Sequence, residues 1–395
     1  MIQAADIHKI VEESRDEIIE CLAELLQTPS VTEHEVEISK VFCKWIEKAG
    51  IEPQIHGISP DHPNVLGEWF GSKPGKRFIF NGHMDTFPPT EGDPGLYGPF
   101  SGKVVGDYIY GRGAADMKGG DAAALMAVTL LKRMGFDPKG SILLSYMCDE
   151  EIGGRYGVKW LVKQGLLEGD FGICMEPTRS KVLVGHSGIL RMWITYTSEP
   201  AGSYYDLLTK NALEKSLIAI NALYKVRERA RTYKNPYYKN ASLGITTLHA
   251  GKATNVHASE SRFSIDYRMI PGQTHEGVMA ELFGVLDALK AEDPSMEYTW
   301  EIISDRPVLD IPEDSDIVKV CCEAYKEVTG KDAELYRRHG GSDAATIFGH
   351  NGILMPNWGP GNDMTEATTP NEKICISDYL AAVEYYMLTL VKLMG

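Results

Sequence analysis

Apolar strands alternate with helical stretches in the first half of the chain. The runs RFIF (77–80), SILLSYM (141–147) and FGIC (171–174) have the length and composition of buried strands, whereas GGDAAALMAVTLLKRM (119–134) is helical in spacing. Such alternation is typical of parallel strands joined by crossover helices. The pattern therefore predicts an α/β domain with a mixed, mostly parallel sheet flanked by helices.

The pattern changes after residue 182. Strand-like segments lie at 188–197, 241–251, 258–270 and 296–303, and helical segments lie at 209–226 and 275–290. The order β-α-β-β-α-β is that of a ferredoxin-like α+β module. A helix, a glycine-rich stretch and a final helix follow, and their pattern is again that of the first half of the chain. We therefore expect a discontinuous catalytic domain (1–182 and 299–395) interrupted by an inserted domain (183–298).

Composition and charge exclude several classes of protein. The 395 residues carry 40 basic and 55 acidic side chains, a net charge of −15, and contain no Lys/Arg-rich block, which argues against nucleic acid as a partner. Residues 1–27 resemble one amphipathic helix, with charges throughout and no apolar membrane span. Seven cysteines without a C-x-x-C motif indicate a reduced compartment. We expect a cytoplasmic protein with no membrane partner.

Acidic and metal-binding side chains follow three of the predicted strands. His83 and Asp85 come directly after the first, Glu150 and Glu151 after the second, and Glu176 after the third. Side chains two apart on an extended chain share a face, and open α/β sheets bind ligands at the carboxyl ends of their strands. Each group alone has a structural alternative, since a histidine can cap a strand and an acidic run can be a solvated face.

A further candidate is Asp116, which lies in GRGAADMKGG with glycines on both sides. A phosphate-binding loop is the rival interpretation, but the chain lacks G-x-x-x-x-G-K-[ST] and the dinucleotide glycine spacing. Histidine with several carboxylates is a ligand set for zinc, manganese or cobalt, and another carboxylate can serve as general base. Together the pieces predict a metal-dependent hydrolase.

The ordered motifs HMDT, GRGAADMKGG, DEEIGG, MEPT, GHSGILR, GGSDA, GPG and TPNE extend along essentially the whole chain. In this the chain resembles the acetylornithine deacetylase, succinyl-diaminopimelate desuccinylase and glutamate carboxypeptidase-like family of metallopeptidases. The resemblance implies an α/β catalytic domain with an inserted lid that also dimerises. It therefore implies a homodimer acting on a small molecule.

The resemblance also implies roles for individual residues. One metal would be bound by His83, Asp116 and Glu176, with Asp116 bridging to a second metal held by Glu151. Glu150 would be the general base. Asp85 would orient His83 by contacting it from the second shell of the metal site, as the usual partner of a ligating histidine does. The family also has a cis peptide bond after the bridging aspartate.

Other positions would bind the substrate. Asn255 and Arg268 match family positions that grip a substrate carboxylate, although Arg268 could equally form a surface salt bridge. His339 has three interpretations: a loop residue without function, a replacement ligand for the second metal, or a substrate contact. Gly341, in GGSDA, and Tyr204 complete the predicted substrate-binding set.

The chain departs from the family at two histidines. The family sequence A-H-T-P-x-E reads here Ala367 to Glu372 with Thr368 in place of histidine, and the lid sequence A-H-S has Gly202. Threonine is a poor ligand for a borderline divalent ion, so we expect one metal per chain (manganese, zinc or cobalt) and an impaired second site. Loss of an oxyanion donor typically costs roughly 2.7–4 kcal/mol in the transition state.

These losses favour altered chemistry. The leading hypothesis is hydrolysis of a C–N bond in a small anionic substrate, such as removal of an amino group from an electron-poor aromatic ring, where charge develops away from an acyl oxygen. Within the family this resembles the branch that acts on 5-nitroanthranilate. One alternative is a two-metal N-acyl amino acid deacylase of the acetylornithine or succinyl-diaminopimelate type. Another is an inactive binding homologue.

Overall fold

The computed structural model describes residues 2–199, 201, 210–362 and 366–395. The chain divides into two compact units. The first unit comprises Met1–Gly185, Ile311–Tyr336 and Ser342–Gly395, and the second comprises His186–Asp310 and Arg337–Gly341. Strands β8 (Val182–His186), β15 (Leu309–Asp310) and β16 (Leu335–Arg338) lie where the chain passes from one unit to the other.

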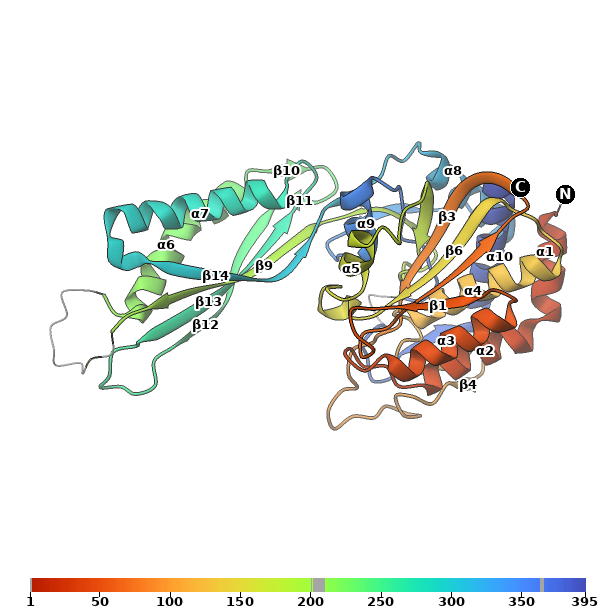
Figure 1. Ribbon diagram of the computed structural model, residues 1–395, viewed down its shortest axis with the longest axis horizontal. Coiled ribbons are helices and arrows are strands. Elements are labelled where there is room, and N and C mark those ends of the chain that lie inside the picture. The colour runs from red at the N-terminus through yellow and green to blue at the C-terminus, as the bar shows by residue number, and fades with distance from the viewer. Residues whose placement is uncertain (1, 200, 202–209, 363–365) are drawn as a thin grey trace. The chain divides into compact units, whose positions relative to one another are not determined.

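The first unit is built on a mixed five-stranded sheet (Figure 1). Its strands, in spatial order, are β1 (Pro53–His56), β2 (Asn64–Phe70), β6 (Lys139–Met147), β3 (Lys73–His83) and β7 (Phe171–Cys174). Strand β3 pairs in parallel with β6 and β7, whereas β2 pairs antiparallel with β6 and β1. The predicted α/β domain with a mixed sheet is confirmed.

Helices flank this sheet, with α3 on β1 and β2, α4 on β3 and β6, and α9 on β3 and β7. The helices of the first unit are α1 (Ala4–Glu13), α2 (Arg15–Gln27), α3 (Val36–Lys48), α4 (Lys118–Arg133), α5 (Val158–Lys163), α8 (Asp316–Thr329), α9 (Asp343–Asn351) and α10 (Ile376–Met394). The prediction of a single helix over residues 1–27 is wrong, because this segment forms two helices. The backbone leaves helical geometry at Ser14 (φ −103°, ψ 9°), so two helices form instead of one.

A smaller antiparallel sheet of the first unit has the order β17 (Lys373–Cys375), β5 (Tyr108–Tyr110) and β4 (Lys103–Val105). Its pairing brings the chain just before β17 alongside the chain just after β5, since Gly111 N donates to Glu372 O at 3.0 Å. Segments about 260 residues apart in sequence therefore meet beside Asp116.

The second unit is an α+β module in which helices α6 (Ala212–Ala230) and α7 (His275–Glu292) cover one face of a four-stranded sheet (Figure 1). The strand order is β12 (Ser242–Ala250), β13 (Glu260–Met269), β9 (Gly188–Thr197) and β14 (Tyr298–Arg306), all antiparallel. A hairpin of β10 (Lys234–Asn235) and β11 (Lys239–Asn240) follows α6. The predicted ferredoxin-like order is confirmed. Within the described ranges, no helix is long and apolar enough to cross a membrane.

The parallel pairing of β3 fixes where the candidate ligands lie. His83, the last residue of β3, is opposite Met147, the last residue of β6, and Asn81 is opposite Cys174 at the end of β7. Parallel strands with aligned ends deliver the residues that follow them to one edge of the sheet. The first turn of α4 packs directly against this edge. A Cβ atom added at Gly120 would lie 2.1 Å from the carbonyl oxygen of Met175.

We expect Gly120→Ala to destabilise the protein by about 1–3 kcal/mol or more, because the methyl group would force α4 away from the residues that follow β7. Gly284→Ala, in α7, is the matched control. A Cβ there meets nothing within 4 Å, so the loss of unfolded-state entropy should stabilise by roughly 0.5–1 kcal/mol. Urea unfolding followed by circular dichroism measures both changes. Wild-type stability in Gly120→Ala would contradict this account of the packing.

Candidate metal centre

Five acidic or imidazole side chains converge at the edge where β3, β6 and β7 end. Their donor atoms form two overlapping groups, in each of which one ligand atom per residue lies within 4.8 Å of the others. The first group is His83, Glu150 and Glu176, and the second is His83, Asp116 and Glu151. The Nε2 atom of His83 is 3.4 Å from Asp116 Oδ1 and 4.0 Å from Glu150 Oε2.

The donor set fits a divalent metal ion. His83, Glu150 and Glu176 are buried, while Asp116 and Glu151 are partly exposed. One imidazole and several carboxylates suit zinc, manganese or cobalt. Carboxylates crowded in a poorly hydrated site repel one another, and a cation is the group that relieves this repulsion.

The pKa shifts at this centre agree with an excess of negative charge. Burial lowers the pKa of His83, but hydrogen bonds with Asp116 and Asp85 outweigh it and raise that pKa well above its ordinary value. Desolvation and the charge of Asp116 raise the pKa of Glu151 well above its ordinary value. Both shifts have the sign expected where several carboxylates share one space.

The carboxylate of Asp85 holds the turn that carries the two glutamates. It accepts hydrogen bonds from Glu150 N at 3.0 Å, Glu151 N at 3.2 Å and the hydroxyl of Thr32 at 2.8 Å. The nearest contact of His83 Nδ1 is the main-chain oxygen of Asp85 at 2.9 Å, with the carboxylate Oδ1 at 3.4 Å. Asp85 thus contacts both the candidate ligand and the backbone of the neighbouring turn.

Two further acidic residues support this turn and were not predicted from the sequence. Asp149 adopts the left-handed conformation (φ 53°), and its carboxylate accepts from Tyr156 N at 2.9 Å and Gly157 N at 2.8 Å. Buried Glu35 accepts from Asp149 N at 3.2 Å and Glu33 N at 3.0 Å. The only sequence signal was the acidic run at 149–151, which equally describes a solvated face.

The loop that carries Asp116 has the backbone that the resemblance implies, since the peptide bond between Asp116 and Met117 is cis. Thr368, at the position of the family's missing histidine, is exposed and has a φ of 62°. β-Branched residues seldom adopt such an angle, whereas histidine tolerates it better. In the part of the chain that the structure describes, neither donor group contains a second imidazole.

The predicted substrate-binding residues lie in the second unit, apart from Tyr204, which like Gly202 lies outside the described residues. Asn255 is exposed between β12 and β13. Arg268 donates to both carboxylate oxygens of Asp266, at 2.7 and 3.1 Å, and to the carbonyl oxygen of His339 at 3.4 Å. His339 Nδ1 is 3.0 Å from the hydroxyl of Ser187. A Cβ at Gly341 would lie 2.9 Å from Arg306, so this glycine permits a close approach.

A unit with a mixed sheet carries a histidine and carboxylates at the sheet's edge, which is the donor set expected of a metal-dependent hydrolase, and a second, α+β unit is inserted into its chain. The sequence model of the peptidase family M20/M25/M40 matches residues 79–392. The chain belongs to this family.

The similarity to known proteins extends over almost the whole chain. The succinyl-diaminopimelate desuccinylase of Psychromonas ingrahamii is 27% identical over 95% of this chain and 98% of its own. The N-formyl-4-amino-5-aminomethyl-2-methylpyrimidine deformylase of Bacillus subtilis is 26% identical over 98% of this chain and 96% of its own. Among solved structures, a metallo-carboxypeptidase of the M20 family from Sulfolobus solfataricus has a TM-score of 0.78 at 20% identity, covering 95% of this chain and 99% of its own.

We expect Glu35→Gln to change the pH dependence of stability in protein freed of metal. Burial and the charge of Asp85 raise the pKa of Glu35 from 4.5 to about 7. A carboxyl whose pKa is higher in the folded state contributes stability that is fully present below pH 4.5 and is lost as pH rises through about 7. Glutamine cannot ionise, so the variant should be more stable than wild type at pH 8 by about 1–3 kcal/mol.

Urea unfolding at pH 5 and pH 8 measures this difference. Glu37→Gln is the matched control, because Glu37 is exposed and pairs with Lys40 at 2.6 Å on the surface. That variant should keep the wild-type pH dependence. An unchanged pH dependence in Glu35→Gln would show that Glu35 is already ionised without cost in the folded protein.

Proposed function

We propose that this protein hydrolyses a C–N bond of a small anionic substrate and is not an ordinary peptidase. Its metal centre would have a full set of protein ligands for one ion only. The observation that carries the proposal is the convergence of His83 with two pairs of carboxylates at the edge of the sheet, and within each of the two groups the donor atoms lie within 4.8 Å of one another. His83, Asp116 and Glu176 would hold the ion. Glu151 would complete only part of a second position.

A divalent ion bound here would supply Lewis acidity and lower the pKa of water at the site. Glu150 would take the proton from the attacking water and return it to the leaving nitrogen. Its main-chain N–H is held by Asp85 Oδ1 at 3.0 Å, which supports a fixed position for the base. Asp85 would also orient His83 through its main-chain oxygen and its carboxylate.

The two missing histidines support a reaction other than ordinary deacylation. With Thr368 in place of a nitrogen donor, the second position lacks the imidazole that a borderline ion prefers. With Gly202 in place of the lid histidine, an acyl oxyanion would lack a donor. Hydrolytic deamination of an electron-poor aromatic amine avoids both needs. For 5-nitroanthranilate, water would add at the amino-bearing carbon, the ring and nitro group would accept the charge, and ammonia would leave as a hydroxyl group replaces it.

A second candidate is the hydrolysis of an N-acyl group, and the similar proteins favour it. The two relatives are named a desuccinylase and a deformylase, and both names describe removal of an acyl group from nitrogen. In this case His339 or a water molecule would complete the second metal position. The contact of His339 Nδ1 with Ser187 at 3.0 Å would have to break for that nitrogen to bind an ion.

The second unit would serve as a lid and dimerisation domain, with Asn255, Arg268, His339 and Gly341 contacting the substrate. Exposed apolar side chains on β14 and α6 support a contact with a second copy. Trp300 is 48% and Ile303 43% exposed on β14, and Leu217 is 51% exposed on α6.

The seven cysteines of the sequence are free, which supports a cytoplasmic location.

We expect Glu150→Gln to retain its fold and its metal while turnover falls by about 10²- to 10⁴-fold, because the amide cannot accept the proton from water. Steady-state kinetics and metal analysis of the purified variant measure the two quantities. Glu150 also belongs to one of the donor groups. Metal loss in Glu150→Gln as complete as in His83→Ala would therefore make Glu150 a ligand and remove it as the base.

We expect wild-type protein to hold about one ion per chain and to release ammonia from 5-nitroanthranilate, with negligible activity on N-acetyl and N-succinyl amino acids. Metal analysis and parallel assays of ammonia release and deacylation test this. Two ions per chain and deacylation at roughly 10⁴ M⁻¹s⁻¹ or better in kcat/KM would establish the second candidate instead. A metal-loaded protein that is inert toward every substrate would favour a binding homologue.

A further inference from the structure

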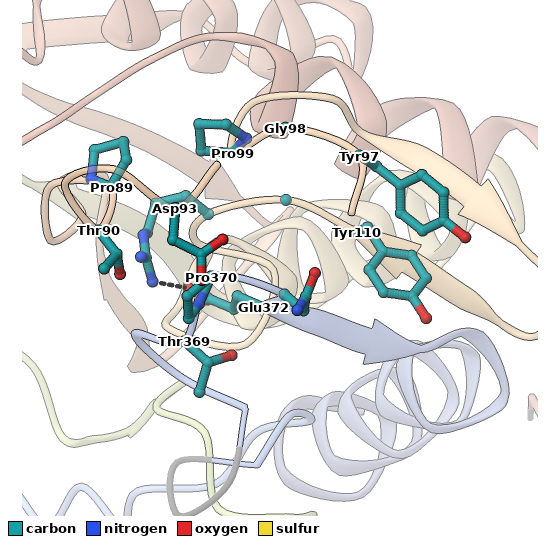
Figure 2. Close-up of a pocket in the computed structure, with 13 residues that line it drawn as sticks. Pro89, Thr90, Asp93, Tyr97, Gly98, Pro99, Tyr110, Thr369, Pro370 and Glu372 are labelled. Carbon is teal, nitrogen blue, oxygen red and sulfur yellow. Dashed lines mark hydrogen bonds and ion pairs between the residues drawn. The ribbon is translucent and has the colours of Figure 1, made fainter. Parts of the chain in front are cut away.

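The segment Thr369–Glu372, which follows the position of the missing histidine, ends in a buried carboxylate beside the candidate metal centre. Glu372 is 3% exposed, and its Oε1 atom accepts from the main-chain N–H groups of Gly113 at 3.0 Å, Ala115 at 3.0 Å and Asp116 at 3.1 Å. Its Oε2 atom accepts from Arg112 Nη1 at 2.7 Å, and both residues line the pocket in which Figure 2 shows Glu372.

Such an arrangement fixes the loop it binds. Three N–H groups of one loop point at a single oxygen, and a buried carboxylate is tolerated only where such donors replace its water. Hydrogen bonds to an ionised acceptor are about twice as strong as neutral ones. The last of the three donors is the amide of Asp116 itself, so the position of Glu372 determines where the backbone of this candidate ligand lies.

The same segment also holds a second loop through different atoms. Asn371 Oδ1 accepts from Leu96 N at 2.7 Å, and a Cβ at Gly95 would lie 2.1 Å from the carbonyl oxygen of Pro370. These contacts are to the loop that lines the pocket of Figure 2 and not to the loop of Asp116. Asn371 and Glu372 are therefore neighbours with separable roles.

We propose that Glu372 is a positioning residue for the metal centre, which holds Asp116 in place through the amides of its loop. The inference rests on the proposed metal-binding function of His83 and Asp116. On this account the C-terminal segment contributes to the centre through the contact of Glu372 with the loop of Asp116, although Thr368 supplies no imidazole.

The test is Co²⁺ binding to purified, metal-free Glu372→Gln. Glutamine places an NH₂ group where one carboxylate oxygen was, so a donor faces either the three amides or Arg112, and the loop must shift. We expect Co²⁺ to bind about 10- to 100-fold more weakly, as for the loss of other groups that support ligands. We also expect the visible absorption of the Co²⁺-loaded protein to change, while circular dichroism stays that of the wild type.

Two controls separate the possible outcomes. Asn371→Ala removes a contact from the same segment but not from the loop of Asp116, so it should bind Co²⁺ like wild type. His83→Ala should lose Co²⁺ binding. Wild-type affinity and absorption in Glu372→Gln, with loss in His83→Ala, would overturn the role of Glu372 alone. Wild-type binding in His83→Ala would overturn the metal centre itself.

If Glu372→Gln does not fold, Glu372→Asp takes its place. Aspartate keeps the charge but is one methylene shorter, so it withdraws the oxygen from the three amides. The same weakening of Co²⁺ binding and change in absorption are expected. A folded Glu372→Asp variant with wild-type affinity and absorption would overturn the proposal.

Discussion

The centre depends on the parallel pairing of β3 with β6 and β7. Because His83 lies opposite Met147 and Asn81 opposite Cys174, the three strands end together. A change of register by one residue would turn His83 to the other face of the sheet and separate it from Glu150 and Glu176. The ligand set is thus a consequence of main-chain hydrogen bonding in a buried sheet, which is rigid enough to hold like charges close together.

A second set of acidic residues acts on the backbone around these ligands. Asp85, Glu35 and Glu372 accept main-chain N–H groups from the turns that carry Glu150, Glu151 and Asp116, and Asp149 accepts the N–H group of Gly157 at the start of α5. Turns between strands and helices have N–H groups without partners, and a carboxylate satisfies two or three of them at once. The site therefore combines the carboxylates of the two donor groups, which suit a cation, with carboxylates that accept main-chain N–H groups.

The three residues expected to hold one ion are divided between the two donor groups, since Glu176 is in the first, Asp116 is in the second and His83 is in both. Every residue expected to hold the first ion lies in the two donor groups, and Glu150 lies beside His83. The position of the missing imidazole is occupied by exposed Thr368. The reaction that we propose needs water of lowered pKa and a base, but neither a second ion nor an acyl-oxygen donor, and it therefore agrees with these residues.

The sequence by itself determined the architecture and the candidate ligands. Strand and helix periodicity predicted the mixed sheet and the β-α-β-β-α-β order, because burial imposes a period of two on strands and 3.6 on helices. Residue type and motif order singled out His83, Asp116, Glu150, Glu151 and Glu176. Only the tertiary structure decided which carboxylates face the shared space and which hold the backbone. In sequence, Glu35 belonged to no motif, and Glu372 ended the motif TPNE without an assigned role. What distinguishes them is burial against N–H groups 114 and about 260 residues away. Such partners come together only when the sheet has formed, so no local pattern could have indicated what these two carboxylates bind.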